Sequence, residues 1–220
     1  MHHKTRVDSF EPIRARLVNS LQGRIDTHIS KQVLQAMMQV PRHLFVRESD
    51  ASHAYEDYPL SIGHKQTISA PHMVAIMCTL LDVQKGMNIL EIGAGSGYHS
   101  AILAELTGPT GKVYSVERIP ELLKFARNNL HNTGYHNVII TTGDGTLGLP
   151  KHAPYDRITV ACAAPTIPPP LIEQLKQGGK MVIPIGESVQ DLYLVHKNDT
   201  ISKEKSGGVV FVPLIGEHGF

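Results

Sequence analysis

Apolar residues recur at helical spacing in the first third of the chain. Within residues 9–22 they fall at every third or fourth position, and a second helical pattern follows Ser30, a residue typical of a helix N-cap. Pro41 ends this second helix, and Pro71 opens a third. Residues 51–70 show no regular period, and a loop of that length inside a compact domain is typically functional.

Beyond residue 86, strand-like apolar runs alternate with helix-like stretches. This alternation predicts βαβ crossovers and a largely parallel sheet. The final two runs have no helix between them, so they are expected to pair antiparallel through a turn near Asn198. The expected strands are 88–92, 112–117, 137–142, 155–161, 180–185, 192–197 and 209–214, and the expected helices are 98–106, 120–130 and 168–176, the last ended by Gly178 and Gly179.

No linker or internal repeat divides the chain, so its 220 residues are expected to form a single domain. Hydrophobic residues make up 41% and charged residues 19%, which is enough apolar surface for a sizeable core. The pattern separates a helical cap and a long irregular loop at 1–70, a βαβ core at 71–186, and terminal strands at 187–220.

Charge and composition argue against several kinds of partner. The 21 Lys and Arg nearly balance the 20 Asp and Glu, so no nucleic-acid partner is expected. No apolar run approaches the roughly 18 residues of a membrane span, and no signal peptide is expected, because no apolar region follows Met1–Lys4. Two cysteines suit a reducing cytoplasm. The thirteen histidines show no metal-ligand spacing, so no metal is expected.

A glycine-rich turn lies between the first strand of the core and the helix after it. Gly93, Gly95 and Gly97 allow a sharp turn and a close approach of the backbone to a ligand. Glu117 ends the next strand, where a carboxylate can accept hydrogen bonds from two ribose hydroxyls. These features predict a nucleoside cofactor at the carboxyl end of a parallel sheet.

Glu91, just before the turn, favours one cofactor over another. The dinucleotide fingerprint places a pyrophosphate at the helix N-terminus, where a neighbouring carboxylate would be unfavourable. S-adenosylmethionine carries an ammonium and a sulfonium, so Glu91 fits it better than it fits NAD. The alternative is that Glu91 only caps local backbone donors and the glycines only form a tight turn.

A second acidic turn, Asp144 and Gly145, follows the third strand of the core. Its position at a carboxyl end of the sheet suits an acceptor for an adenine amino group. The alternative is a plain Asp-Gly turn.

Several motifs together resemble the protein-L-isoaspartate O-methyltransferases. The glycine motif is shared with most Rossmann-like methyltransferases, whereas QTISAP is much more specific. The resemblance runs from roughly residue 10 to 215, and its motifs are AYEDYPLSIG at 54–63, QTISAP at 66–71, LEIGAGSG at 90–97, GDG at 143–145, APYD at 153–156, AAP at 163–165 and FVPL at 211–214.

This resemblance implies an α/β, Rossmann-like class I methyltransferase that depends on S-adenosylmethionine. Its mostly parallel seven-stranded sheet would carry an N-terminal helical cap and antiparallel C-terminal strands. The implied activity is protein repair: methylation of the free α-carboxylate of L-isoaspartyl residues, with D-aspartyl residues as a further substrate class, which initiates conversion to aspartyl through a succinimide. The implied partners are isoaspartyl-containing peptides and proteins, and the enzyme is expected to be a monomer.

Residue roles also follow from the resemblance. Ser69 is implied as the catalytic hydroxyl, and a carboxylate substrate with a pKa of about 4 is already anionic, so no general base is required. The cofactor-binding residues would be Thr67, Glu91, Gly93, Gly95, Gly97, Glu117, Asp144 and Gly145. The substrate-binding residues would be Ser69, Ala70, Val212 and Pro213.

Alternatives remain for Ser69 and for the chain as a whole. On spacing alone, Ser69 is typical of an N-cap for the helix that Pro71 opens. Cys162 is expected in the core. Two departures from the family pattern, Ser61 and Lys65, affect the loop's geometry, because Lys65 would be strained at a positive φ. The other functions considered are a methyltransferase for a small metabolite or RNA, and a non-catalytic adenosyl-binding module.

Overall fold

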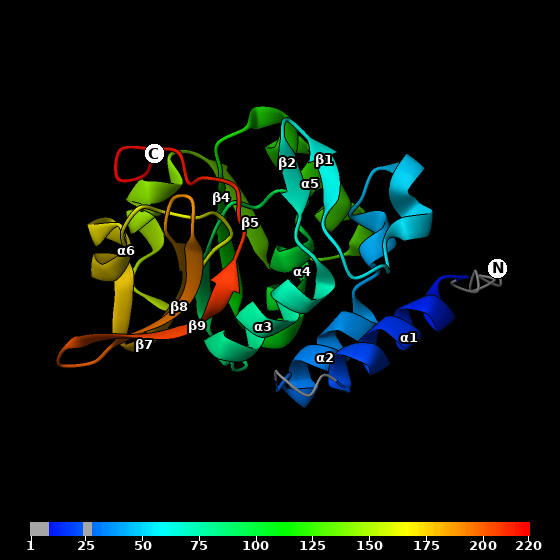
Figure 1. The fold of residues 1–220 in the computed structure, drawn as a ribbon, viewed down its shortest axis with the longest axis horizontal. Helices are drawn as coiled ribbons and strands as arrows, with labels where there is room; N and C mark the ends of the chain where they lie inside the picture. Colours follow the sequence, from blue (N-terminus) through cyan, green and yellow to red (C-terminus); the bar gives the residue numbers. More distant parts are fainter. Residues whose placement is uncertain (1–8, 24–27) are drawn as a thin grey trace.

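The computed structural model describes residues 9–23 and 28–220 (Figure 1). Residues 1–8, which include the Met1–Lys4 segment of the signal-peptide expectation, and residues 24–27 lie outside the described residues. Among the described residues, the main body is a seven-stranded sheet in the order β5-β4-β3-β6-β7-β8-β9, with helices on both faces. The strands of this sheet are β3 (Asn88–Ile92), β4 (Lys112–Glu117), β5 (Val138–Thr142), β6 (Tyr155–Val160), β7 (Leu175–Ile185), β8 (Gln190–Lys197) and β9 (Ile201–Val209).

Strands β3 to β7 pair in parallel, and β8 and β9 continue the sheet through antiparallel pairings. This confirms the fold class. The chain builds outward from β3 to β5 and then returns to β6 on the other side of β3. This reversal creates a switch point between β3 and β6, where such sheets bind ligands beyond the carboxyl ends of their strands.

Two apolar clusters lie on opposite faces of the sheet, because side chains alternate along each strand. Ile89 of β3 belongs to the cluster that includes α3 (Pro71–Leu81), α4 (Tyr98–Thr107) and α5 (Pro120–Thr133). Its neighbour Leu90 belongs to the cluster that includes α6 (Pro169–Gln174). Figure 1 shows α6 on the opposite side of the strands from α3 and α4.

The N-terminal helices pack outside the α3–α4 layer (Figure 1). They are α1 (Glu11–Gln22) and α2 (Lys31–Gln39), close to the expected ranges. Ser30 caps α2 as expected, since its hydroxyl accepts a hydrogen bond from the backbone N–H of Val33.

The expectation of an irregular 51–70 segment was wrong in its second half. Residues 60–68 form an antiparallel hairpin of β1 (Leu60–Gly63) and β2 (Gln66–Ile68). Its turn holds His64 at φ 51° and Lys65 at φ 58°. The expected strain at Lys65 is therefore present, at a typical cost of about 1–2 kcal/mol for a non-glycine residue. The turn lacks the usual Asn-Gly or Asp-Gly pair, so its residues do not indicate a hairpin.

Two expectations near the C-terminus were also wrong. Helix α6 ends at Gln174, and Gly178 and Gly179 lie in an irregular stretch of β7 rather than at the end of the helix. The last strand is β9, not 209–214. Strand β9 is a largely exposed edge strand of mostly polar residues, and it shows no apolar alternation. Its hairpin with β8 turns at Asn198 as expected.

The helices within 9–23 and 28–220 include none that is long and apolar enough to span a lipid bilayer.

Candidate active site

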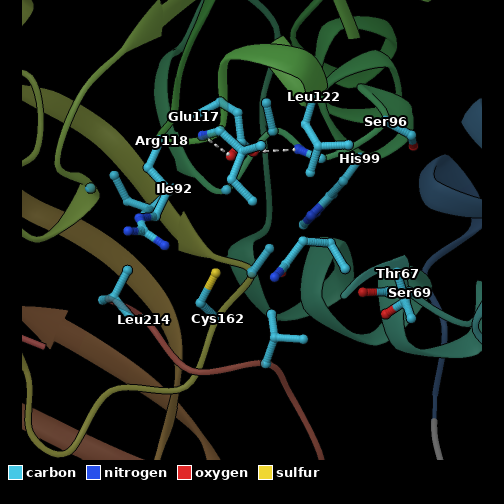
Figure 2. A pocket seen from close by; sticks show the side chains of 18 of the residues that line it. Thr67, Ser69, Ile92, Ser96, His99, Glu117, Arg118, Leu122, Cys162 and Leu214 are labelled. Atoms are coloured by element: carbon cyan, nitrogen blue, oxygen red, sulfur yellow. Dashed lines mark hydrogen bonds between the residues drawn. The ribbon is translucent and has the colours of Figure 1, made fainter. Parts of the chain in front are cut away.

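A pocket of about 120 Å³ lies at the carboxyl ends of β3, β4 and β6, at the switch point of the sheet. Its walls come from segments far apart in the sequence: the hairpin, the glycine turn, the end of β4 and the C-terminal segment. Figure 2 shows these side chains facing a common space. The lining includes Thr67, Ser69, Ile92, His99, Glu117, Arg118, Leu122, Cys162 and Leu214.

The glycine turn forms one wall of the pocket. Gly93, Gly95 and Gly97 have φ values of 89°, 55° and 84°, in the left-handed region that favours glycine. Gly93 and Gly95 line the pocket, as expected for cofactor-binding residues. Gly97 does not. A Cβ on Gly97 would lie 3.2 Å from Leu130 Cγ, so Gly97 allows α4 and α5 to pack closely.

Glu117 lies in the pocket wall next to the glycine turn and is only 5% exposed (Figure 2). Its Oε2 accepts a hydrogen bond of 2.9 Å from the Gly95 N–H, and its Oε1 accepts one of 2.9 Å from the Ile119 N–H. A carboxylate has about four acceptor sites, so about two remain for a ligand. This arrangement fits the paired hydroxyls of a ribose.

Glu91 is placed differently from the expectation. It is fully buried and is not one of the residues lining the pocket. Strand alternation turns it toward α4, where its Oε2 accepts hydrogen bonds from the hydroxyls of Ser100 and, at 2.7 Å, Ser115. Burial raises the pKa of Glu91 to about 7. Glu91 therefore supports the turn from behind, and it does so through hydroxyls rather than by capping backbone donors.

Asp144 also lies outside the pocket lining, whereas its neighbour Gly145 lines the pocket. Oδ1 of Asp144 accepts hydrogen bonds from the Thr146 N–H at 2.8 Å and from the Thr146 hydroxyl at 2.7 Å. Its Oδ2 accepts one of 2.8 Å from the Glu217 N–H. The carboxylate thus caps a short 3-10 helix (Gly145–Leu147) and holds the C-terminal segment.

Replacing Asp144 with alanine should lower the free energy of unfolding by about 0.5–2 kcal/mol, the usual cost of a lost cap. Burial alone would raise the pKa of Asp144, but the bonds from Glu217 and Thr146 outweigh it and hold the pKa below its ordinary value. The wild-type advantage should therefore be present at pH 7 and disappear as the pH falls through that lowered pKa. Urea denaturation at several pH values measures it.

Glu217→Ala is the matched control for that experiment. Glu217 donates through its backbone N–H, so this variant keeps the bond to Asp144 and should retain wild-type stability. Equal stability of Asp144→Ala and Glu217→Ala would contradict the assigned role.

Thr67 and Ser69 lie together on the pocket wall, at and just beyond the end of β2 (Figure 2). The N-cap residue of α3 is Ala70, and no side chain caps that end of the helix. The interpretation of Ser69 as a helix cap was therefore wrong. The Ser69 hydroxyl makes no hydrogen bond to any residue in the described part of the chain, which leaves it available to a ligand. Ala70 is buried and does not line the pocket.

The C-terminal segment supplies Val212 and Pro213 to the pocket, as expected for substrate-binding residues. Ala163 holds this segment through two backbone hydrogen bonds: its N–H donates to the Val212 carbonyl at 2.8 Å, and its carbonyl accepts from the Leu214 N–H at 2.7 Å. These bonds fix the segment across the carboxyl end of the sheet.

Sequence reasoning missed several pocket residues, among them Cys162, Arg118 and His99. Cys162 was expected in the core but lines the pocket, and burial raises its pKa to about 12. Arg118 and His99 also line the pocket. The only indication in the sequence was position: Arg118 follows Glu117, and His99 lies two residues after the glycine turn.

The parallel sheet, the glycine turn at its switch point and the acidic residue that ends the next strand define a class. They are the features of a Rossmann-like domain that binds a nucleoside cofactor at the switch point of its sheet.

Comparison with known proteins identifies the family. The model of the protein-L-isoaspartate (D-aspartate) O-methyltransferase family matches residues 14–219, and the chain belongs to this family. A protein-L-isoaspartate O-methyltransferase from Methanothrix thermoacetophila is 58% identical over 207 residues, covering 94% of this chain and 97% of that protein. Protein-L-isoaspartate O-methyltransferase 1 from Archaeoglobus fulgidus is 56% identical over 197 residues, covering 90% and 91%.

Solved structures with a similar fold carry the same family name. A protein-L-isoaspartate O-methyltransferase superposes with a TM-score of 0.86 at 30% identity, covering 94% of this chain and 67% of that one. A structure from Plasmodium falciparum, described as a putative protein-L-isoaspartate O-methyltransferase in complex with S-adenosyl-L-homocysteine, gives 0.81 at 28% identity, covering 92% and 98%.

Proposed function

We propose that the protein repairs damaged proteins by transferring a methyl group from S-adenosylmethionine to the free α-carboxylate of L-isoaspartyl residues, and that D-aspartyl residues are a further substrate class. The observation that carries this proposal is the Ser69 hydroxyl, which faces the cofactor pocket without a partner among the described residues. Methylation of the carboxylate initiates its conversion to an aspartyl residue through a succinimide.

The residues of the pocket fit the cofactor. Glu117 would accept the ribose hydroxyls, and Gly93, Gly95, Gly145 and Thr67 would lie along it. When bound, S-adenosylmethionine supplies a methyl group made electrophilic by the attached sulfonium. The remaining expected cofactor residues, Glu91, Gly97 and Asp144, would act by holding the walls of the pocket in place.

At the substrate end, the side chains need only to orient a nucleophile. An α-carboxylate is ionised at pH 7, so no base is needed. The Ser69 hydroxyl would donate a hydrogen bond to it, and the backbone around Val212 and Pro213 would hold the isoaspartyl segment. Cys162 keeps its proton at pH 7, because burial raises its pKa to about 12, so its thiol does not compete as a nucleophile.

The hairpin can keep water from the site. Ile62 of β1 is buried, and its Cδ1 would lie 3.4 Å from a Cβ built on Gly95, so the hairpin packs directly over the glycine turn. Excluding water removes solvation from a carboxylate whose charge is lost in the reaction, which favours the transfer.

The methylated product should be an ester that is lost in mild base and decays through a succinimide. Labelled methyl groups on a peptide product, followed by brief alkali treatment, check this. An alkali-stable label would mean N- or C-methylation and would favour the second candidate function, methylation of a small metabolite or RNA.

We also propose that the enzyme works in the cytoplasm as a monomer, without a nucleic-acid or membrane partner. Its net charge of +1 and its two free cysteines support this environment.

A further inference from the structure

Two buried polar atoms beside the pocket have no hydrogen-bond partner among the described residues: His99 Nε2 and Glu91 Oε1. His99 is only 9% exposed, lines the pocket and lies in the first turn of α4. Figure 2 shows its ring directed into the cavity. Leaving buried polar atoms unpaired costs free energy, and such atoms in a pocket wall indicate that a ligand supplies the missing partner.

The two groups act on each other. His99 Nδ1 lies 3.7 Å from Glu91 Oε1, so the ring stands between the buried carboxylate and the pocket. Burial lowers the pKa of His99 to about 4, so the ring is neutral at pH 7. Because burial raises the pKa of Glu91 to about 7, this carboxyl is partly ionised at pH 7, and its ionised form favours the ring proton on Nδ1, which leaves the lone pair on Nε2.

The negative charge of Glu91 beside the His99 ring determines whether a cationic or an anionic ligand group is favoured there. Within the described part of the chain, Glu91 interacts electrostatically with Glu117, Cys78 and Cys162, none of which is a cation, while the cation of the pocket wall, Arg118, acts on Cys162. A lone pair backed by a buried carboxylate attracts a cationic donor and disfavours an anion.

We propose that His99 Nε2 accepts a hydrogen bond from the ammonium group at the amino-acid end of the cofactor, and that Glu91 is the positioning residue that orients and polarises the ring. This inference rests on the proposed function only for the identity of the cofactor. Under this inference, Glu91 acts on the ammonium group through the His99 ring, although Glu91 itself does not line the pocket.

A binding experiment without any peptide substrate tests this inference. Calorimetry would compare three ligands on the wild type and on His99→Leu: S-adenosylhomocysteine, its analogue lacking the amino group, and methylthioadenosine, which has no amino-acid end. His99→Leu should weaken binding of S-adenosylhomocysteine roughly 10- to 150-fold, the range for a hydrogen bond to a charged group. Its affinity for the other two ligands should stay within about twofold of wild type, which also shows that the variant folds.

Two further variants refine the result. His99→Gln places an amide oxygen near the position of Nε2 and should recover most of the lost affinity. Glu91→Gln removes the charge while keeping the shape, and it should weaken S-adenosylhomocysteine but not methylthioadenosine.

Equal losses for all three ligands would overturn the inference, because His99 would then only support the fold. Equal losses for S-adenosylhomocysteine and its deaminated analogue would overturn it too, because the contact would be to the ligand carboxylate. A wild type that binds none of these ligands would overturn both this inference and the proposed function. The expected ligand pattern in a protein that does not methylate isoaspartyl peptide would support the inference and overturn only the proposed function.

Discussion

Glu117→Ala should weaken the binding of S-adenosylmethionine and S-adenosylhomocysteine by about 1.5–3 kcal/mol, roughly 10- to 150-fold. The variant removes the acceptor for the ribose hydroxyls, and it also leaves the N–H groups of Gly95 and Ile119 without their partner. The loss therefore combines a missing ligand contact with a loosened glycine turn. Calorimetry with both ligands measures it.

Two controls separate these contributions. Glu117→Gln keeps one side-chain oxygen as an acceptor, so it should lose less affinity than the alanine variant. Glu121→Ala removes an acidic residue from the first turn of α5, outside the pocket, and should bind like wild type. Unchanged affinity in Glu117→Ala would remove Glu117 from the binding site.

Ser69→Ala should reduce kcat/KM on an isoaspartyl peptide about 10- to 100-fold. The hydroxyl would donate to a carboxylate that loses its charge, so the bond is strongest in the ground state and its main use is orientation. We expect KM to rise and kcat to fall while cofactor affinity stays unchanged, because Glu117 and the glycine turn are intact. Steady-state kinetics with cofactor binding measured in parallel provide the check.

The structure also predicts how Ser69→Ala affects stability. Since Ala70 is the N-cap residue of α3 and the Ser69 hydroxyl bonds to no described residue, Ser69→Ala should keep the wild-type melting temperature. Ser202→Ala, on the exposed edge strand β9, is the matched control and should be wild type in both stability and kinetics. A lowered melting temperature with wild-type kinetics would make Ser69 a structural residue only.

The buried strands were predictable from the sequence because both of their faces pack against apolar side chains. β3 and β4 match the expected ranges residue for residue, since strands covered on both faces read as continuous apolar runs. β9 gives no such signal, because an exposed edge strand carries lysines and serines. The β1–β2 hairpin was missed because its strands are short and its turn uses His64 and Lys65 instead of glycine or asparagine.

The sequence was enough to predict that the site lies at the carboxyl edge of the sheet. It was not enough to predict to which face of the sheet each side chain there turns. Position at the end of a strand placed Glu117 and Gly145 correctly at the pocket. It could not show that Glu91 turns toward α4, or that Asp144 is used by Thr146 and Glu217. Cys162 was expected in the core because it follows an apolar strand, and the sequence does not indicate that a cavity begins at the end of β6.

The most direct test of the proposed function is methyl transfer from labelled S-adenosylmethionine to an isoaspartyl peptide, beside the aspartyl peptide of the same sequence. We predict an alkali-labile label on the isoaspartyl peptide alone, and its progressive conversion to the aspartyl form over repeated cycles. Equal labelling of the two peptides, or no labelling of either by a protein that binds the cofactor, would contradict the function proposed for this pocket.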